Sequence, residues 1–238
     1  MGMLTLDGPI QSTLFTVGHD YDPEPIRGRM RQIFNRVMRD GEDVFEGGAS
    51  ISQVCYLLHL ARKTRARTIV EVGFNIGYSC LGFLEASPTT RVISFELNDR
   101  PCVGTAKAFI DRHYPGRHRL VIGDSRETLP LYATGMHTDR ADLIFIDGGH
   151  EYDIVTKDIR NASELAGDRA VVVLDDMTPW YPWGTGPTNA WREAIEDGLI
   201  APLEYLTDAT PGDSVVGPAD RCWAVGRYVH ADRQLPRA

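Results

Sequence analysis

The sequence predicts an α/β protein: a doubly wound, Rossmann-like, mostly parallel sheet of seven strands with an N-terminal helical extension. After residue 68, strand-like and helical segments alternate, which is the order that builds a parallel sheet with right-handed crossovers. The strand-like runs are almost entirely apolar, as expected of strands covered by helices on both faces. The chain has 238 residues, 42% of them hydrophobic, enough for one such core with extensions.

We expect residues 1–63 to form the helical extension and residues 64–238 to form the core. Residues 1–22 predict no regular element. Apolar residues recur at helical spacing from Glu24 to Met38, and Ser50 or Ser52 can cap a second helix that carries an apolar stripe. Because later segments already supply helical layers for the sheet, the extension is predicted to cap an acceptor site or to contact another subunit.

The first of these helices carries an apolar stripe formed by Met30, Ile33, Phe34 and Val37. If no other part of the chain covers this stripe, it favours a homodimer or a higher homo-oligomer. The alternative is that the stripe packs against the core of its own chain.

The core alternates strands and helices in a regular order. The strand-like runs are "TIVEV", "RVISFE", "HRLVI", "ADLIFID" and "AVVVLDD". The helical stretches between them are residues 78–85, 101–113, 126–132 and 151–166. A helix near Thr188 to Glu196 and two last strand-like runs, "LEYLTD" and "CWAVGRYV", complete the expected seven strands.

Composition excludes several classes of protein. The formal net charge of −8 argues against a nucleic-acid partner, which would require a basic surface, although a small anionic ligand needs only a local cluster of donors. No N-terminal signal or membrane-length apolar segment is present, so we expect a cytoplasmic protein with no membrane partner. The cysteines contain no CxxC pair and are predicted to be buried free thiols.

Polar residues follow several of the predicted strands. Glu71 ends the first strand, Glu96 the second, "GDS" (residues 123–125) follows the third, Asp147 ends the fourth, and Asp175 and Asp176 end the fifth. Each acid alone is typical of a turn or a helix cap. In an open α/β sheet, however, ligands bind at the carboxyl ends of the strands, so the convergence of these acids favours a binding site.

The loop after the first strand, "GFNIGYS", indicates the kind of cofactor. Asn75 stands at the middle glycine position of a GxGxG loop between Gly73 and Gly77, and asparagine tolerates left-handed backbone geometry. The loop has too few glycines for a pyrophosphate but suits a ligand with an amino-acid tail. Glu96 is placed for a ribose diol, and Asp124 with Ser125 for a base. Amino acid, ribose and adenine together describe S-adenosylmethionine, with expected contacts at Glu71, Gly73, Asn75, Gly77, Ser79, Glu96, Asp124, Ser125 and Asp147.

The motifs "EVGFNIGYS", "ISFEL", "GDSRETLP" and "IFIDGGHEY" resemble, in order and spacing, those of class I S-adenosylmethionine-dependent methyltransferases. The resemblance covers roughly residues 50 to 180. The "GYS" ending is similar to the catechol and caffeoyl-CoA O-methyltransferases. "IDGGHEY" followed by "VLDDM" is similar to the macrocin and mycinamicin sugar O-methyltransferases of antibiotic biosynthesis.

This resemblance implies a metal site and a catalytic base. In the macrolide enzymes, an aspartate after strand four and two adjacent acids after strand five hold a divalent metal, and a histidine acts as base. Asp147, Asp175, Asp176 and His150 match those positions. This chain has aspartate at 175 where the macrolide enzymes can carry glutamate, and at 176 where the catechol group often has asparagine. Carboxylate oxygens suit Mg²⁺ or Mn²⁺ rather than zinc.

The stretch "IFIDGGHEY" has a physical interpretation of its own. Asp147 emerges at the strand end, where the sulfonium of the cofactor should lie nearby, and Gly148 with Gly149 lets the backbone approach a ligand. His150 precedes a helix whose N-terminus disfavours imidazolium, which would keep the ring neutral and competent as a base. The alternative role of His150 is a helix cap. The alternative for Asp175 and Asp176 is a polar loop without metal.

Two further segments have weaker interpretations. Trp180, Tyr181, Trp183 and Trp191 lie in a stretch rich in proline and glycine, which predicts a loop that walls the acceptor pocket, contacts a second subunit or packs on the core. "GHDYD" (residues 18–22) either caps the acceptor site or forms a solvated turn.

The predicted function is therefore S-adenosylmethionine-dependent methylation of a small molecule. The favoured reaction is O-methylation of a hydroxyl with Mg²⁺ or Mn²⁺ assistance, in secondary metabolism as the antibiotic enzymes imply. A metal-independent N- or C-methyltransferase is the alternative enzyme. A cofactor-binding protein without methyl transfer is the alternative from another class. The missing GxGxxG disfavours a dehydrogenase, and "GYSCL" lacks the second glycine of a GxSxG hydrolase.

Overall fold

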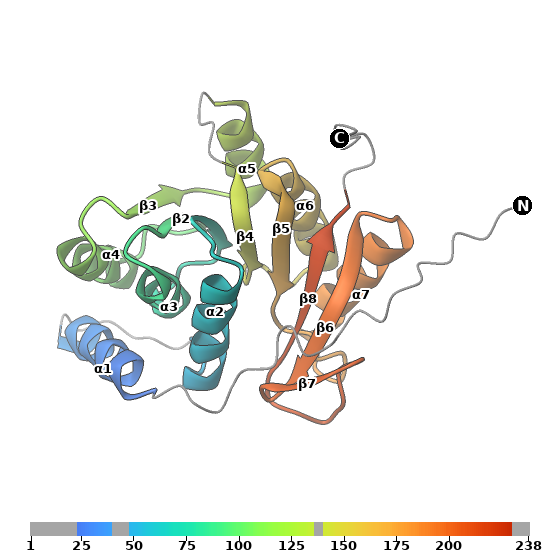
Figure 1. Ribbon diagram of the computed structural model, residues 1–238, viewed down its shortest axis with the longest axis horizontal. Coiled ribbons are helices and arrows are strands. Elements are labelled where there is room, and N and C mark those ends of the chain that lie inside the picture. Colours follow the sequence, from blue (N-terminus) through green and yellow to red (C-terminus); the bar gives the residue numbers. More distant parts are fainter. Residues whose placement is uncertain (1–22, 40–47, 136–139, 230–238) are drawn as a thin grey trace, which may run out of the picture.

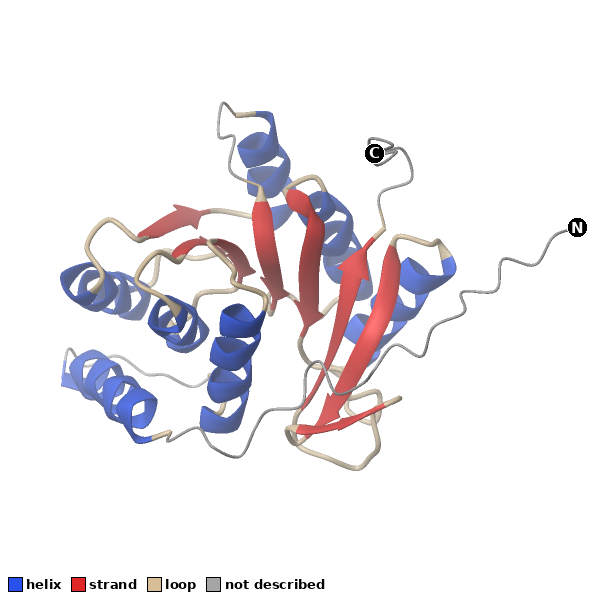
Figure 2. Cartoon of the chain, in the orientation of Figure 1, coloured by secondary structure: helices blue, strands red, loops and turns tan. Residues whose placement is uncertain are grey.

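The computed structural model describes residues 23–39, 48–135 and 140–229, so the "GHDYD" segment lies outside the described residues (Figure 1). One mixed sheet runs through the described chain, with helices on both of its faces (Figure 2). The predicted doubly wound α/β fold is confirmed.

The sheet has the strand order β3-β2-β1-β4-β5-β8-β6-β7. Strands β1 to β5 pair parallel with one another, whereas β8 pairs antiparallel with β5 and β6, and β7 pairs antiparallel with β6. The strands are β1 (Thr68–Val72), β2 (Arg91–Glu96), β3 (His118–Ile122), β4 (Ala141–Ile146), β5 (Ala166–Leu174), β6 (Ile200–Thr207), β7 (Thr210–Gly212) and β8 (Cys222–Tyr228).

The prediction of seven strands was wrong by one, because the short strand β7 was not expected. Asp208 and Ala209 join β6 to β7 with φ angles of 45° and 67°. Positive φ at both central residues is the geometry of a tight hairpin turn, which usually requires Asn-Gly or Asp-Gly. The dipeptide Asp-Ala is not typical of this turn, so the sequence did not predict the hairpin.

Two helical layers cover the sheet. The helices are α1 (Glu24–Arg39), α2 (Ile51–Lys63), α3 (Tyr78–Ala86), α4 (Pro101–His113), α5 (Ser125–Thr134), α6 (Tyr152–Ser163) and α7 (Thr185–Glu196). Helices α1 to α4 share a buried apolar cluster with one face of the sheet, and α5 to α7 share a second cluster with the other face. Adjacent residues of a strand enter opposite clusters, as Ile144 and Phe145 of β4 do, because side chains alternate along a strand.

The N-terminal helices are part of the first of these layers. Ser50 caps α2, as one of the two predicted choices, by accepting a hydrogen bond from the Gln53 amide at 3.2 Å. Tyr56 of α2 packs on Trp223 of β8 with ring centroids 5.4 Å apart and donates a hydrogen bond to Glu204. The division of the chain at residue 63 stays a prediction.

The apolar stripe of α1 is already covered within one chain. Met30, Ile33 and Val37 are buried in the same cluster as α3 and α4, whereas Phe34 is 40% exposed. The stripe was the reason for expecting a homodimer, and the alternative considered for it, packing on its own core, is what the structure shows. The oligomeric state itself stays a prediction.

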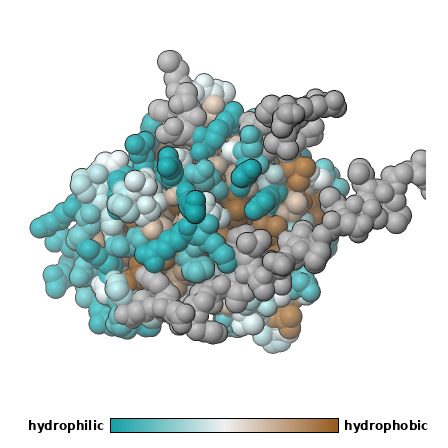
Figure 3. Space-filling view, in the orientation of Figure 1, coloured by the Kyte–Doolittle hydropathy of each residue, from teal (hydrophilic) through white to brown (hydrophobic). Residues whose placement is uncertain are grey.

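The prediction for the cysteines is confirmed. The cysteines are free and buried. None of the helices combines the length and the apolar character that a bilayer crossing requires. Hydrophilic side chains cover much of the molecular face seen in Figure 3.

Candidate active site

A cavity of ≈ 940 Å³ opens at the carboxyl ends of the parallel strands. The strand order reverses between β1 and β4, which is the position where open α/β sheets bind ligands. The cavity is lined by most of the predicted site residues: Gly73, Asn75, Ser79, Glu96, Asp124, Ser125, Asp147, His150, Asp175 and Asp176. Glu71 and Gly77 are predicted site residues that do not line it.

The loop after β1 is held against the end of β4. Gly73 has φ +93°, and a Cβ at that position would lie 1.9 Å from the backbone oxygen of Asp147, so only glycine fits. Asn75 has φ 49°, which confirms that it occupies a left-handed position in the loop. Because residue 73 has no side chain, the loop after β1 can contact the backbone at the end of β4.

Glu96 shapes the same loop. Its Oε2 accepts hydrogen bonds from the backbone amides of Phe74 at 3.0 Å and Asn75 at 2.8 Å. Its Oε1 accepts only a longer bond, 3.3 Å, from the amide of Asn98. Glu96 lines the cavity, so one carboxylate oxygen secures the loop while the other has capacity left to accept hydrogen bonds from a ligand.

Glu71 lies behind the loop instead of at the cavity surface. It is fully buried and accepts hydrogen bonds from the hydroxyls of Ser79 and Ser94. Ser94 also contacts the His118 ring at 3.0 Å. Burial raises the pKa of Glu71 to about 7, against the opposing effect of the two hydroxyls. In this arrangement Glu71 supports the loop through Ser79.

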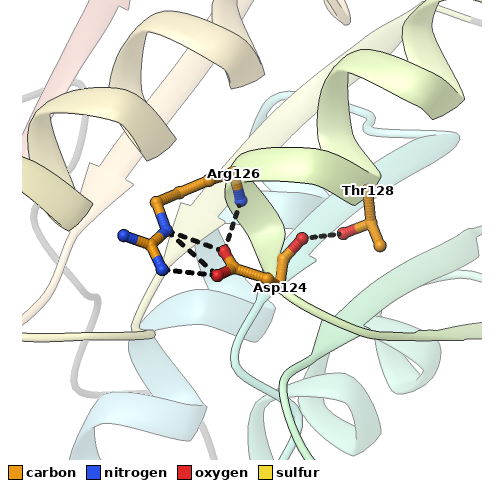
Figure 4. A network of polar contacts seen from close by, with 3 residues as sticks. All are labelled: Asp124, Arg126 and Thr128. Atoms are coloured by element: carbon orange, nitrogen blue, oxygen red, sulfur yellow. Dashed lines mark hydrogen bonds and ion pairs between the residues drawn. The ribbon is translucent and has the colours of Figure 1, made fainter.

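Asp124 is tied to a neighbouring cation. Its carboxylate accepts from the side chain of Arg126 at 2.6 Å to 3.0 Å and from the Arg126 amide at 2.9 Å, and its backbone oxygen accepts from Thr128 (Figure 4). The hydrogen bonds from Arg126 lower the pKa of Asp124 to about 2. Both carboxylate oxygens of Asp124 therefore already accept hydrogen bonds from Arg126. Arg126 thus lies at the position where Asp124 was expected to contact the base of the cofactor.

The three acids at the ends of β4 and β5 converge as the sequence predicted. One carboxylate oxygen from each of Asp147, Asp175 and Asp176 lies within 4.8 Å of the others. Burial, followed by the charges of the neighbouring aspartates, raises the pKa of Asp147 well above its ordinary value. The same causes raise the pKa of Asp175 to about 7. Within the described residues, no Lys or Arg side chain forms an ion pair with these acids.

His150 belongs to this cluster. Its Nε2 lies 2.8 Å from Oδ2 of Asp176. The helix N-terminus was expected to keep the ring neutral, but the hydrogen bond to Asp176 raises the pKa of His150, against the smaller opposing effect of burial. The direction of the shift is therefore opposite to the one expected from the helix terminus, because the carboxylate is in contact with the ring, whereas the field of the helix terminus is spread over its first turn.

The tryptophan-rich segment is only partly a loop. Helix α7 begins at Thr185, and Trp191 lies inside it and is 1% exposed, so this residue belongs to the core. Trp183 lines the cavity, is 47% exposed and stacks on Tyr181 with ring centroids 4.6 Å apart. Trp180 donates a hydrogen bond to the backbone oxygen of Ala219. Of the three tryptophans, only Trp183 is therefore placed to contact a ligand.

Two residues at the acidic end of the cavity carried no signal in the sequence. Gln53 of α2 is fully buried beside Asp175, and its side-chain amide lowers the pKa of Asp175, although neither amide atom makes a hydrogen bond among the described residues. Arg221, directly before β8, lines the cavity and also lowers the pKa of Asp147 and Asp175 by its charge. Both are distant from the acids in sequence and lie in no motif, so only the fold brings them together.

Comparisons with known proteins agree with this geometry. A family model described as a methyltransferase domain matches residues 70–177. The O-methyltransferase hkm8 of Aspergillus hancockii is 25% identical over 191 residues, covering 78% of this chain and 73% of that protein. The fold is similar to that of an O-methyltransferase from Bacillus cereus in complex with SAH (TM-score 0.67, 17% identity, 84% of this chain and 90% of that chain). It is also similar to TomG, an O-methyltransferase from Streptomyces achromogenes involved in tomaymycin synthesis, in complex with SAM (TM-score 0.67, 19% identity, 92% and 96%).

The raised pKa in the acid cluster predicts that the free energy of unfolding depends on pH. The folded pKa of Asp175 is about 7, above its ordinary value of 3.8, so protonation of Asp175 favours the folded state below pH 4 and this contribution is lost as the pH rises through 7. In chelator, Asp175→Asn should therefore be more stable than the wild type at pH 8, by on the order of 1 to 4 kcal/mol. The difference, measured by urea unfolding, should shrink toward pH 5.

The exposed Asp99 provides the matched control. Asp99→Asn should change the free energy of unfolding little at any pH in this range. A difference between wild type and Asp175→Asn that stays constant from pH 5 to pH 8 would contradict the assignment of a buried, repelled carboxylate.

Proposed function

Because this chain is a class I S-adenosylmethionine-dependent methyltransferase, we propose that it transfers the methyl group to a hydroxyl oxygen of a small molecule with the help of a divalent cation. The single observation that carries the proposal is the convergence of Asp147, Asp175 and Asp176 beside His150 at the cofactor cavity. The similarity to O-methyltransferases supports an oxygen acceptor. The role of TomG in tomaymycin synthesis supports secondary metabolism as the setting.

The cavity fits the cofactor chemically. Gly73 lets the loop after β1 approach the backbone of Asp147, and the left-handed Asn75 turns this loop, so that both residues line the cavity. Oε1 of Glu96 has capacity to accept from the hydroxyls of a ribose. Gly73, Asn75 and Ser79 would hold the amino-acid end of the cofactor, and Glu96 the ribose. The adenine base of the cofactor would lie beside Ser125 and the Asp124–Arg126 pair.

The acid cluster fits a divalent cation such as Mg²⁺ or Mn²⁺. All three donors are carboxylate oxygens, which hard cations prefer, and they lie close enough to share one ion. Burial, and after it the charges of the neighbouring aspartates, raise the pKa values of Asp147 and Asp175, so part of the shift is mutual repulsion. An ion of charge two offsets that repulsion, whereas the sulfonium of the cofactor offsets only one charge.

The chain itself would position the reactants and move one proton. When bound, the cofactor supplies an activated methyl group and the cation lowers the pKa of the acceptor hydroxyl. Asp147 lies in backbone contact with the cofactor loop and thus links the two halves of the site. His150 would take the hydroxyl proton at a ring nitrogen, and Asp176 would stabilise the imidazolium that results. Trp183 would exclude water from one side of the acceptor.

Glu96 provides a test of cofactor placement. A carboxylate that accepts hydrogen bonds from ribose hydroxyls should contribute about 2–3 kcal/mol to binding. Glu96→Ala should therefore weaken S-adenosylmethionine binding on the order of a hundredfold, measured by calorimetry. Glu127→Ala, an exposed glutamate of α5, is the control and should bind as the wild type does. Unchanged affinity in Glu96→Ala would remove Glu96 from the cofactor site.

The metal hypothesis predicts a specific pattern of loss. Excess chelator should abolish methyl transfer, and Mg²⁺ or Mn²⁺ should restore it, while calorimetry should still detect cofactor binding. Asp176→Ala should show the same loss without chelator, because it removes one of the three carboxylates. Full activity in excess chelator would overturn the metal hypothesis and favour a metal-independent N- or C-methyltransferase.

His150 should behave differently from the acids. As a general base, its loss in His150→Ala should lower turnover roughly 10²- to 10⁴-fold while metal and cofactor still bind. Because the base form requires a neutral ring and the pKa of His150 is raised, wild-type turnover should increase with pH through that raised pKa. The same rise in His150→Ala would show that another group provides it.

A further inference from the structure

Three arginines line the cavity, and two of them are already accounted for. Arg126 is paired with Asp124 at 2.6 Å. Arg100 donates to Oδ1 of Asn75 at 3.3 Å, so it supports the proposed cofactor loop. The third, Arg221, lies in neither of these contacts.

Two hydrogen bonds hold Arg221 in position, and in neither of them does a carboxylate accept from the guanidinium. Its Nη2 donates to the backbone oxygen of Gly48 at 2.7 Å, and its backbone amide donates to Oδ1 of Asp208 at 3.1 Å. Within the part of the chain that the structure describes, no acidic side chain lies within 4.0 Å of its guanidinium nitrogens. A half-buried guanidinium has five N–H donors in a fixed fork, so donors are left for a ligand.

Arg221 lies at the acidic end of the cavity. The next residue, Cys222, accepts a backbone hydrogen bond from Met177 at 2.8 Å, which places the start of β8 beside the Asp175–Asp176 segment. The charge of Arg221 lowers the pKa of Asp147 and Asp175, which agrees with this placement. Trp183 lines the same cavity.

From this juxtaposition we propose that Arg221 recognises an anionic group of the methyl acceptor, so that the substrate is a hydroxyl compound that also carries a carboxylate. This inference rests on the proposed function, since it assigns the acidic end of the cavity to the acceptor. The acceptor hydroxyl would lie toward the three aspartates and His150. Its carboxylate would lie toward the guanidinium, where bidentate hydrogen bonding matches the planar fork of arginine.

A matched pair of probes tests this assignment. 3,4-Dihydroxybenzoate and its methyl ester share the metal-chelating diol and differ by one charge. Their affinities for the full chain, with Mg²⁺ and S-adenosylhomocysteine bound, can be measured by calorimetry. The wild type should bind the acid about tenfold or more tightly than the ester, which is the usual worth of a charge-assisted hydrogen bond. Arg221→Gln should lower this ratio to about one, and Arg221→Lys should retain part of it.

The control is Arg227→Gln, which removes an exposed arginine from β8, the strand that follows Arg221, and should keep the wild-type ratio. Equal binding of acid and ester by the wild type, binding of neither, or an unchanged ratio in Arg221→Gln would overturn the proposal. A parallel loss of Mn²⁺ affinity and of both probes in Arg221→Gln would also overturn it, because Arg221 would then serve the aspartates alone. The proposed function fails separately, if no hydroxyl compound, charged or neutral, accepts a methyl group.

Discussion

The close approach of Gly73 to the backbone of Asp147 is the contact on which the rest of the site depends. A Cβ at position 73 would lie 1.9 Å from the Asp147 oxygen, so the loop after β1 and the end of β4 can meet only because residue 73 has no side chain. The strand order reverses between β1 and β4, and both residues of this contact line the cavity at that position. It joins the part of the chain proposed to hold the cofactor to the part that carries the acids.

The second constraint is electrostatic. Carboxylates of like charge repel one another, but here the buried Asp175 and the half-buried Asp147 and Asp176 each place an oxygen within 4.8 Å of the others, with raised pKa values for Asp147 and Asp175. The left-handed backbone at Asp176, φ 56°, contributes to this arrangement, because it redirects the chain directly after β5. Aspartate is one of the few non-glycine residue types that tolerates this conformation.

Several acids of the site hydrogen-bond to the protein itself in addition to their proposed contact with the cofactor. Glu71, buried behind the loop, bonds Ser79 and Ser94, and Glu96 bonds the loop amides, so two acids that the sequence assigned to the cofactor also maintain the loop itself. Asp124 was also assigned to the cofactor and also has a structural contact, because Arg126 donates hydrogen bonds to both of its carboxylate oxygens. Loss of any of these acids would therefore alter the shape of the site as well as its contacts.

The sequence by itself determined the order of elements and the acids at the strand ends, because both depend on local patterns. Apolar runs of strand length, helical periodicity and the glycine loop are visible over a few residues, and parallel strands then place Glu96, Asp147 and Asp175 along one edge. Tertiary structure alone decided the rest. The β6–β7 hairpin uses an Asp-Ala turn without the usual residues, and Trp191 entered the core as part of α7. The pKa of His150 is set by Asp176, 26 residues away, and Gln53 and Arg221 reach the acids from opposite ends of the chain. Contacts between distant residues depend on how the layers pack, which no local pattern records.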